Sequence, residues 1–368
     1  MGSCFVYFQF FRRRTMVKKL DDAFLQQTVR QMVKKKNNFG AILCVEQGKD
    51  FSWEGAAGNL NADDQYFIAS VTKFYMTAVV LKLRAEKKLA LEDPISNYLS
   101  ADIMNRLHVL NGVDYSKALT IKHLISNTSG LPDYFAYKQP SGESVASQLM
   151  KGKDQNWTLE ETVTLVKGLK PKFAPGQKGK VNYCDTNYKL LGRIIEKVTG
   201  MSMADVFRTY IFEELNLSKT YVYEDVNDTK PVSLNYKSNK IHLPNYLTSI
   251  PSEGGIVSTA KETMIFIKAF FAGRFFPKEE IEELKQWNMV FFPGQFYYGI
   301  GLEKLWTPRL LSPLRPIQEV LGFWGQSGAF AFYNHERDVY FTGTINQLSG
   351  FGHSAAFHAM IRIIKALK

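Results

Sequence analysis

The stretch from residue 70 to residue 88 constrains the fold of this chain more than any other segment. Its helical spacing places apolar side chains on almost every side: Val71, Phe74, Tyr75, Met76, Val79, Val80, Leu81 and Leu83. A helix with that pattern is buried in the middle of a molecule rather than lying on its surface. The sequence therefore predicts a central helix that other elements cover.

Strand patterns occur on both sides of this helix in the sequence. Residues 41–45 form a short apolar run, and residues 51–53 follow after a turn as its hairpin partner. Near the other end of the chain, residues 329–333 and 339–345 are alternating or β-branched runs joined by a polar turn. Helical spacing is found over residues 20–36 and 354–368.

The part of the chain between these strands is mostly helical with loops. Thr158 and Glu161 have the spacing of a capping box for a helix over residues 159–168. Another helix is expected to start after Asp185 and to stop at Gly200, since glycine commonly follows the last turn of a helix.

This order predicts an α+β fold, in which an antiparallel β-sheet is assembled from both chain ends and flanked by helices, with a helical lobe inserted. We expect an N-terminal tail over residues 1–18 and a discontinuous sheet domain over residues 19–93 plus 231–368. A mainly helical insertion is expected over residues 94–230. A functional site is expected in the cleft between the sheet domain and the insertion.

The charge of the chain bears on its partners, and its cysteines bear on metal binding and on the compartment. The formal net charge is +11, but only residues 12–14 and 34–36 form basic runs. A dispersed surplus favours a solvated basic face over a polyanion groove, so no nucleic-acid partner is expected. The three cysteines show no CxxC spacing, which indicates neither a disulfide framework nor a zinc site and favours a reducing compartment.

The N-terminal segment does not have the order of a secretory signal. An apolar stretch over residues 4–11 precedes the charges of residues 12–14, whereas a signal peptide has its charges first. No apolar run approaches the about 20 residues that a membrane-spanning helix needs. We expect a cytoplasmic protein whose first residues are an upstream extension before Met16 or a short interfacial anchor.

Ser70 and Lys73 stand three residues apart at the start of the central helix, so their side chains share one face. A serine hydroxyl is a weak nucleophile unless a neighbouring base takes its proton, and a lysine partly desolvated in a cleft can do so. For an isolated Ser-x-x-Lys pair, the simpler interpretation is a helix cap and a surface charge. A lysine on an otherwise apolar helix is an odd surface residue, however.

Further segments place this pair in a wider pattern. Phe-Ile-Ala-Ser-Val-Thr-Lys over residues 67–73 resembles the first motif of the serine β-lactamase family, which includes class C β-lactamases, D-alanyl-D-alanine carboxypeptidases and related esterases. Ser-Asn-Thr-Ser-Gly-Leu over residues 126–131 is similar to the family's His-Thr-Ser-Gly-Leu loop, with Asn127 in place of histidine. Asn-Tyr-Cys-Asp over residues 182–185 resembles its Tyr-x-Asn motif.

Two more segments complete the resemblance, which spans roughly residues 35–350. Glu-Gly-Gly-Ile-Val-Ser-Thr-Ala over residues 253–260 is similar to the family's glycine-rich segment. Trp-Gly-Gln-Ser-Gly-Ala over residues 324–329 falls where the family has Lys-Thr-Gly or His-x-Gly. Five matches in the right order are far more specific than any single one.

The resemblance implies a role for each matching residue. Ser70 would attack a carbonyl and form an acyl-enzyme, while Lys73 and Tyr183 would move its proton to the leaving group. For Tyr183, this role requires nearby positive charge to lower its pKa, which Lys73 could supply. The backbone N–H groups of Ser70 and Ala329 would form the oxyanion hole. The remaining positions of these motifs, Asp185, Gln326, Ser327 and Gly328, would contact substrate.

Two of these positions depart from the family's usual residues. Asp185 replaces asparagine, a variant familiar among esterase-like members. It could keep Lys73 charged and shift the work of the base to Tyr183, or it could turn outward and cap the next helix. Gln326 replaces a cationic or titratable residue that attracts a substrate carboxylate, so we expect an ester or a peptide-like amide without a carboxylate near the scissile bond.

Other catalytic classes find little support. The chain has no Gly-x-Ser-x-Gly elbow, no phosphate-binding Gly-x-x-x-x-Gly-Lys loop and no metal-ligand spacing among its histidines, so neither a metal nor a cofactor is expected. The sequence thus predicts a serine hydrolase, either an esterase or a D-amino-acid-specific peptidase. A catalytically silent binding protein that kept the fold is the alternative, because Asp185 and Gln326 both depart from the pattern.

Overall fold

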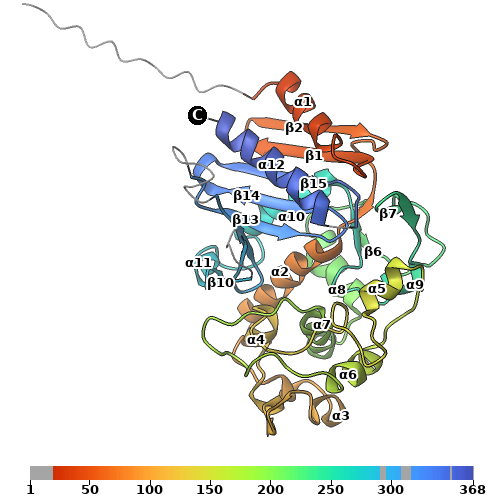
Figure 1. Ribbon diagram of the computed structural model, residues 1–368. Coiled ribbons are helices and arrows are strands. Elements are labelled where there is room, and N and C mark those ends of the chain that lie inside the picture. Colours follow the sequence, from red (N-terminus) through yellow and green to blue (C-terminus); the bar gives the residue numbers. More distant parts are fainter. Residues whose placement is uncertain (1–19, 291–295, 308–315, 349, 368) are drawn as a thin grey trace, which may run out of the picture.

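An eight-stranded antiparallel sheet, built from both ends of the chain, forms the centre of the computed structural model (Figure 1). The structure describes residues 20–290, 296–307, 316–348 and 350–367, so the tail expected over residues 1–18 lies outside these ranges. The first part of the chain contributes β1 (Gly40–Gln47) and β2 (Phe51–Gly58). The last part contributes β10 (Asn288–Met289), β11 (Phe296–Tyr298), β12 (Glu303–Leu305), β13 (Val320–Trp324), β14 (Phe330–Asn334) and β15 (Val339–Thr344).

The two ends of the chain meet where β1 pairs with β15, and the strand order is β10-β11-β12-β13-β14-β15-β1-β2. Val45 lies opposite Phe341 in this ladder. Along β1, Leu43 and Val45 belong to the core on one face of the sheet, whereas Ile42 and Cys44 belong to the core on the other. Successive side chains on a strand point to opposite faces, so a strand covered on both sides is apolar throughout.

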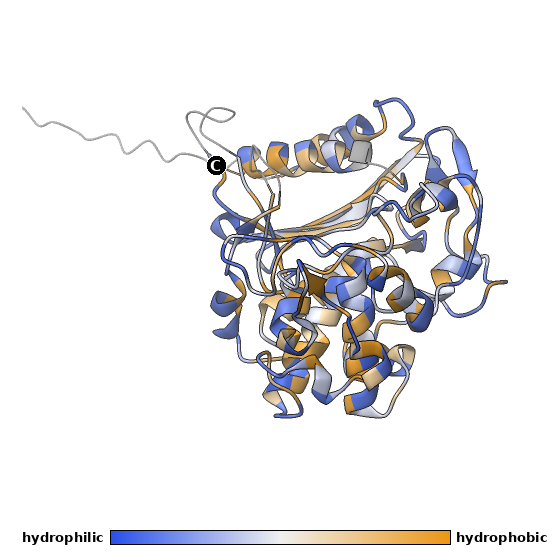
Figure 2. Ribbon diagram, turned by 60° about the horizontal axis from the view of Figure 1, so that its bottom comes forward, coloured by the Kyte–Doolittle hydropathy of each residue, from blue (hydrophilic) through white to orange (hydrophobic). Residues whose placement is uncertain are grey.

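Helices cover both faces of the sheet. α1 (Asp22–Met32) packs on β2, and α12 (Gly350–Ala366) packs on β14 and β15, while α10 (Ala260–Phe271) packs on β1, β14 and β15. Figure 2 shows the sheet nearly edge-on, with α12 on one side. α1 packs beside α12 on that same face, whereas α2 and α10 belong to the core on the other. None of the described helices is both long enough and apolar enough to cross a membrane. The predicted α+β class, with an antiparallel sheet flanked by helices, is confirmed.

The central helix is α2 (Thr72–Ala85), and a single 3₁₀ turn over Ala69–Val71 precedes it. The helix begins two residues later than the spacing predicted, because Ala69 has a left-handed φ of 46° that interrupts the chain before the helix. It also ends earlier, before Lys87, whose φ is 58°. Every residue of α2 from Thr72 to Leu81 is buried, as the sequence predicted.

Between α2 and the last strands, the described chain forms a mainly helical lobe together with small strands. Its helices are α3 (Ala101–Met104), α4 (Ile121–Ile125), α5 (Val145–Met150), α6 (Leu159–Lys167), α7 (Asp185–Thr199), α8 (Met203–Phe207), a π turn over Arg208–Phe212, α9 (Pro244–Thr248) and α11 (Glu280–Leu284). A three-stranded sheet of β3 (Tyr66–Phe67), β9 (Ile256–Ser258) and β6 (Tyr221–Val222) lies beside α2. The remaining strands form two short hairpins, β4 (Val109–Leu110) with β5 (Val113–Asp114) and β7 (Leu234–Tyr236) with β8 (Asn239–Ile241).

The helix ends in this lobe follow the expected capping signals. Thr158 and Glu161 form a reciprocal capping box at the start of α6. Gly200 takes a left-handed φ of 71° after the last turn of α7. The division into domains at residues 93 and 231 stays a prediction.

Phe74 connects α2 to two other layers and offers a test of this packing. Its ring contacts Phe270 of α10 at 4.3 Å and Phe323 of β13 at 5.9 Å between centroids. We expect Phe74→Ala to lower the free energy of unfolding by about 3–5 kcal/mol, because the lost contacts leave a cavity that rigid neighbours cannot fill. Urea unfolding measures this loss. Ile265→Ala, on the exposed side of α10, is the control and should change stability by less than about 0.5 kcal/mol; equal losses in both variants would contradict the packing described.

Candidate active site

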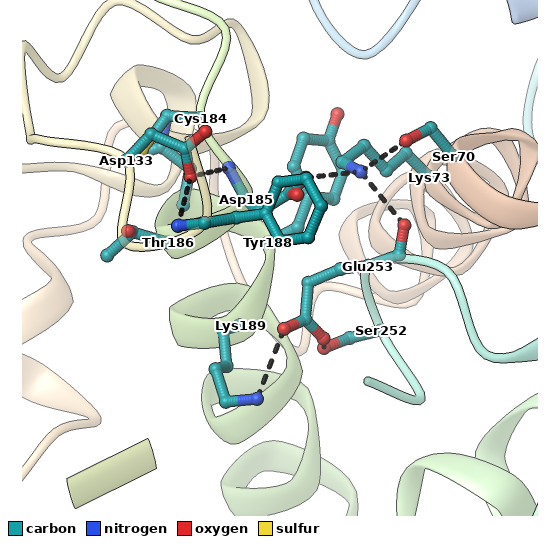
Figure 3. A network of polar contacts seen from close by, with 12 residues as sticks. Ser70, Lys73, Asp133, Cys184, Asp185, Thr186, Tyr188, Lys189, Ser252 and Glu253 are labelled. Carbon is teal, nitrogen blue, oxygen red and sulfur yellow. Dashed lines mark hydrogen bonds and ion pairs between the residues drawn. The ribbon is translucent and has the colours of Figure 1, made fainter. Parts of the chain in front are cut away.

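Ser70 and Lys73 are in direct contact at the junction of the 3₁₀ turn and α2 (Figure 3). The Lys73 Nζ atom donates a hydrogen bond of 2.9 Å to the Ser70 Oγ atom. Lys73 is fully buried, whereas Ser70 is half-buried and lines a cavity. The interpretation of this pair as a helix cap and a surface charge is therefore excluded by the position of Lys73.

Two further acceptors hold the Lys73 ammonium. Nζ lies 2.7 Å from Oδ1 of Asp185 and donates a hydrogen bond of 2.8 Å to the backbone carbonyl of Glu253. With the Ser70 hydroxyl, these groups give the ammonium two hydrogen-bond acceptors and a carboxylate as its ion-pair partner. Asp185 thus points inward to Lys73 rather than outward as a helix cap, which decides between the two alternatives that the sequence left open.

Tyr183 lies at the same place, with its ring centroid 5.2 Å from the Lys73 Nζ atom. Burial raises the pKa of Tyr183 well above 10, the neighbouring carboxyls of Asp185 and Glu303 raise it further, and a hydrogen bond with Ser70 opposes them. The expectation that Lys73 would lower this pKa is wrong. Burial dominates, and the positive charge of Lys73 is already paired with Asp185. Tyr183 is therefore a neutral phenol at neutral pH.

The loop over residues 126–133 fixes the segment that carries Tyr183. The Asn127 carbonyl accepts a 2.9 Å hydrogen bond from the backbone N–H of Asn182, and its side-chain oxygen accepts one of 3.2 Å from Cys184. Asn187 also donates to that oxygen at 2.8 Å. The asparagine that replaces histidine in this motif thus serves as a structural clamp between the loop and the start of α7.

Asp133, at the end of the same loop, is a buried carboxyl next to Asp185. Its Oδ1 atom accepts hydrogen bonds from the backbone N–H groups of Asp185 at 3.1 Å and Phe135 at 3.2 Å. Burial raises the pKa of Asp133 from 3.8 to about 8, and the negative charge of Asp185 adds to this rise. Asp133 therefore holds a proton at neutral pH, while Asp185 is the partner of Lys73.

A buried ion pair supports the carbonyl that holds Lys73 from below (Figure 3). The Glu253 carboxylate lies 3.2 Å from the Lys189 Nζ atom and accepts a hydrogen bond of 2.8 Å from the Ser252 hydroxyl. Lys189 also donates to the Ser249 carbonyl at 2.8 Å. These contacts anchor the Glu253 side chain and so limit the movement of its backbone carbonyl.

The loop over residues 325–329 packs against the turn that carries Ser70. The Ser327 hydroxyl donates a 2.6 Å hydrogen bond to the Phe67 carbonyl, so this side chain holds the loop in place and is not free to reach a substrate. Gly328 takes a left-handed φ of 87° that favours glycine. The backbone N–H of Ala329 donates none of the hydrogen bonds found among the described residues, as an oxyanion-hole donor requires. Gln326 lines the cavity beside Ser70.

The cavity at Ser70 has a volume of about 600 Å³. The predicted site residues that line it are Ser70, Tyr183, Asp185 and Gln326, whereas Lys73, Ser327, Gly328 and Ala329 are not among its lining residues. Large apolar side chains form much of the remaining wall: Phe135, Phe296, Leu305, Trp324 and Phe357. The geometry thus places the Ser70 hydroxyl in a mostly apolar pocket, in contact with the ammonium of the buried Lys73.

Sequence reasoning missed two carboxyls of this cavity, Asp133 and Glu303. Asp133 directly follows the Gly-Leu-Pro segment that was recognised, so its place in the site could have been inferred from that motif. Glu303 follows an apolar stretch over residues 298–302, but Lys304 comes directly after it, so the sequence shows only an ordinary pair of opposite charges at this point. Its neighbours in space could not be read from the sequence.

Comparison with known proteins gives a family and a fold. The family model described as Beta-lactamase matches residues 25–362. Among curated relatives, penicillin-binding protein 4* of Bacillus subtilis is 26% identical over 202 residues, which are 50% of this chain and 38% of that protein. A putative D-alanyl-D-alanine carboxypeptidase of Escherichia coli is 31% identical over 192 residues, or 50% of this chain and 41% of that protein. The matches thus cover less than half the length of these relatives.

Solved structures resemble the chain over nearly its whole length. A D-stereospecific amidohydrolase from Streptomyces sp. superimposes with a TM-score of 0.74 at 24% identity, covering 92% of this chain and 98% of that one. The hydrolase EstCE1, titled as having promiscuous acyltransferase activity, gives 0.75 at 20% identity, covering 94% and 98%. At this level of identity, the likeness concerns the fold.

The raised pKa of Asp133 predicts a pH dependence of stability. Below about pH 4, both the folded and the unfolded state hold this proton. As pH rises, the unfolded state releases it first, so stability falls until pH passes the folded value of about 8. Asp133→Asn cannot ionise and should remove this fall, which is at most about 1.4 kcal/mol per pH unit. Urea unfolding at several pH values measures the difference, with the exposed Asp102→Asn as control; parallel pH curves for wild type and Asp133→Asn would contradict the prediction.

Proposed function

The chain belongs to the β-lactamase family, and from this premise we propose that it is a serine hydrolase that forms an acyl-enzyme on Ser70. The observation that carries the proposal is the 2.9 Å contact between the hydroxyl of Ser70, which lines the cavity, and the buried Lys73. A lone serine has no means of losing its proton, whereas this one has an amine within hydrogen-bond distance.

The ion pair of Lys73 with Asp185 provides a route by which the proton of the Ser70 hydroxyl can leave. Lys73 accepts the Ser70 proton only as a neutral amine, and Asp185, 2.7 Å away, is placed to hold the proton that the ammonium gives up. Attack of Ser70 Oγ on the substrate carbonyl then transfers the serine proton to Lys73. Tyr183, a neutral phenol, donates its own proton to the leaving group and takes a proton from the Lys73 ammonium in return. Lys73 then takes back the proton that Asp185 held, which restores the ion pair. The net change moves one proton from Ser70 to the leaving group.

The substrate carbonyl needs hydrogen-bond donors as negative charge develops on its oxygen. We assign this role to the backbone N–H groups of Ser70 and Ala329, which belong to two segments that pack against each other through the Ser327 hydrogen bond to Phe67. Fixed backbone donors of this kind need no rearrangement at the moment of reaction. Water then attacks the acyl-Ser70 ester and regenerates the serine.

An ester or amide without a nearby carboxylate suits this pocket best. Gln326, a neutral amide, stands where a cation would attract a carboxylate, and none of the described residues that line the cavity is a lysine or an arginine. The similar proteins include an amidohydrolase and a hydrolase with acyltransferase activity, which supports the choice of bond. The proposed reaction is therefore hydrolysis of an ester or a peptide-like amide, as an esterase or a D-amino-acid-specific peptidase performs it.

Removal of the nucleophile tests this proposal. We expect Ser70→Ala to abolish hydrolysis of a p-nitrophenyl acyl ester, lowering kcat by at least about 10³-fold, because no other group can form the acyl-enzyme. A fluorophosphonate probe should label the wild-type protein at Ser70, as mass spectrometry of the peptides will show. Ser147→Ala, on α5 outside the cavity, is the control and should keep full activity.

Two outcomes would count against the proposal. Undiminished ester hydrolysis in Ser70→Ala would place the nucleophile elsewhere. Absence of both turnover and labelling in the wild-type protein would favour the catalytically silent binding protein instead.

The identity of residue 326 tests the inference about carboxylates. We expect Gln326→Lys to raise kcat/KM by about 10-fold for a peptide substrate with a terminal carboxylate, because an ammonium forms a charge-assisted hydrogen bond with it. The same peptide as its amide should gain nothing. Steady-state kinetics on both peptides measures the effect, and an equal change for the two would show that residue 326 does not select for this group.

A further inference from the structure

The cavity at Ser70 is lined by more carboxyl side chains than the proposed reaction requires. Three carboxyl side chains line it, those of Asp133, Asp185 and Glu303. Asp185 is the partner of Lys73, and Asp133 accepts two backbone hydrogen bonds. Glu303 has neither an ion-pair partner nor two backbone hydrogen bonds among the described residues. Its presence in the cavity therefore needs an explanation.

Glu303 is a buried acid without a cation. Only 1% of the residue is exposed, and within the described part of the chain its one hydrogen bond is a 2.8 Å contact from the backbone N–H of Trp324 to Oε2. No described lysine or arginine forms an ion pair with it, since Lys73 pairs with Asp185. Burial raises the pKa of Glu303 well above its usual value, while the hydrogen bond from the Trp324 N–H and the charge of Lys73 act in the opposite direction.

The fold holds Glu303 firmly at this place. It stands on β12, opposite Gly322 of β13. The turn before β12 is fixed against α2, because the Gly301 carbonyl accepts a 2.8 Å hydrogen bond from the Thr77 hydroxyl. Gly301 also has a φ of 60°, and a Cβ atom there would lie 2.2 Å from the Thr77 oxygen. These contacts fix the backbone at the start of β12, which carries Glu303, against the central helix.

A buried carboxylate is costly unless a cation or several donors compensate for its lost hydration. Among the described residues Glu303 has one donor, and the cavity is the open space in front of it. The aromatic side chains of Phe296 and Trp324 line the same cavity, and aromatic rings attract cations through their negative faces. Acid and aromatic groups together favour a positively charged ligand group over a neutral or an anionic one.

We propose that Glu303 binds an ammonium group of the substrate, so that the natural substrates are amides or esters of amino acids with a free amino group and an apolar side chain. This inference rests on the proposed function and specifies its substrate class. The ammonium would supply the counter-ion that Glu303 lacks, and the apolar wall of the roughly 600 Å³ cavity would hold the side chain. Acylation of the amino group removes its charge and should remove this contact.

A matched pair of substrates tests the proposal. We expect the wild-type protein to hydrolyse phenylalanine p-nitroanilide, offered in both D and L forms, with a kcat/KM about 10- to 100-fold above that of its N-acetyl derivative, since a charged hydrogen bond contributes on that scale. Glu303→Gln should reduce this preference by a similar factor, mainly through KM of the free amine. Glu54→Gln is the matched control, because Glu54 is a carboxyl with a raised pKa on β2, away from the cavity.

A second measurement uses the wild-type protein and requires neither turnover nor a folded variant. 2-Phenylethylammonium should protect Ser70 from the fluorophosphonate probe at a concentration at least about 10-fold lower than its uncharged N-acetyl counterpart. Equal protection by the two compounds, or an unchanged preference in Glu303→Gln, would overturn the assignment of Glu303 while Ser70 labelling still supported the hydrolase. Failure of the probe to label Ser70 at all would instead remove the proposed function, and this inference with it.

Discussion

The site depends on one buried ammonium. Lys73 is fully enclosed, and its Nζ atom lies within 2.9 Å of the Ser70 hydroxyl, the Asp185 carboxylate and the Glu253 carbonyl. Loss of any of these acceptors would leave a charge with incomplete compensation in the interior, which costs several kcal/mol. These acceptors come from the 3₁₀ turn, from α7 and from the segment before β9. The contacts of one side chain thus fix the relative position of three parts of the chain.

Such an arrangement is a poor way to obtain stability, because a buried ion pair rarely gains more than its desolvation costs. An apolar residue at position 73 would suit a helix that is otherwise buried and apolar. The surrounding groups are also coupled: burial raises the pKa values of Asp133 and Tyr183, and the charge of Asp185 raises both further. Concentration of perturbed titratable groups beside a cavity is typical of a site selected for chemistry rather than for folding.

We have proposed that the charged groups of the cavity select its substrate. A site for a carboxylate needs a cation at its rim, yet position 326 is glutamine and the lining carries the carboxyls of Asp133, Asp185 and Glu303. The proposed reacting groups lie in or just before the first turns of α2 and α7, whereas the groups proposed to select the substrate lie on β12 and in the loop after β13. The residues proposed to react and those proposed to select the substrate are far apart in the sequence and come together only in the folded cavity.

The sequence by itself determined the central helix, the sheet from both chain ends and the contact of Ser70 with Lys73. These follow from local periodicity and from a spacing of three residues, which helical geometry turns into proximity. Only the tertiary structure decided that Asp185 points to Lys73, that burial raises rather than lowers the pKa of Tyr183, and that Glu303 lines the cavity. Burial and through-space charge depend on distant segments packing together, and no local pattern carries that information.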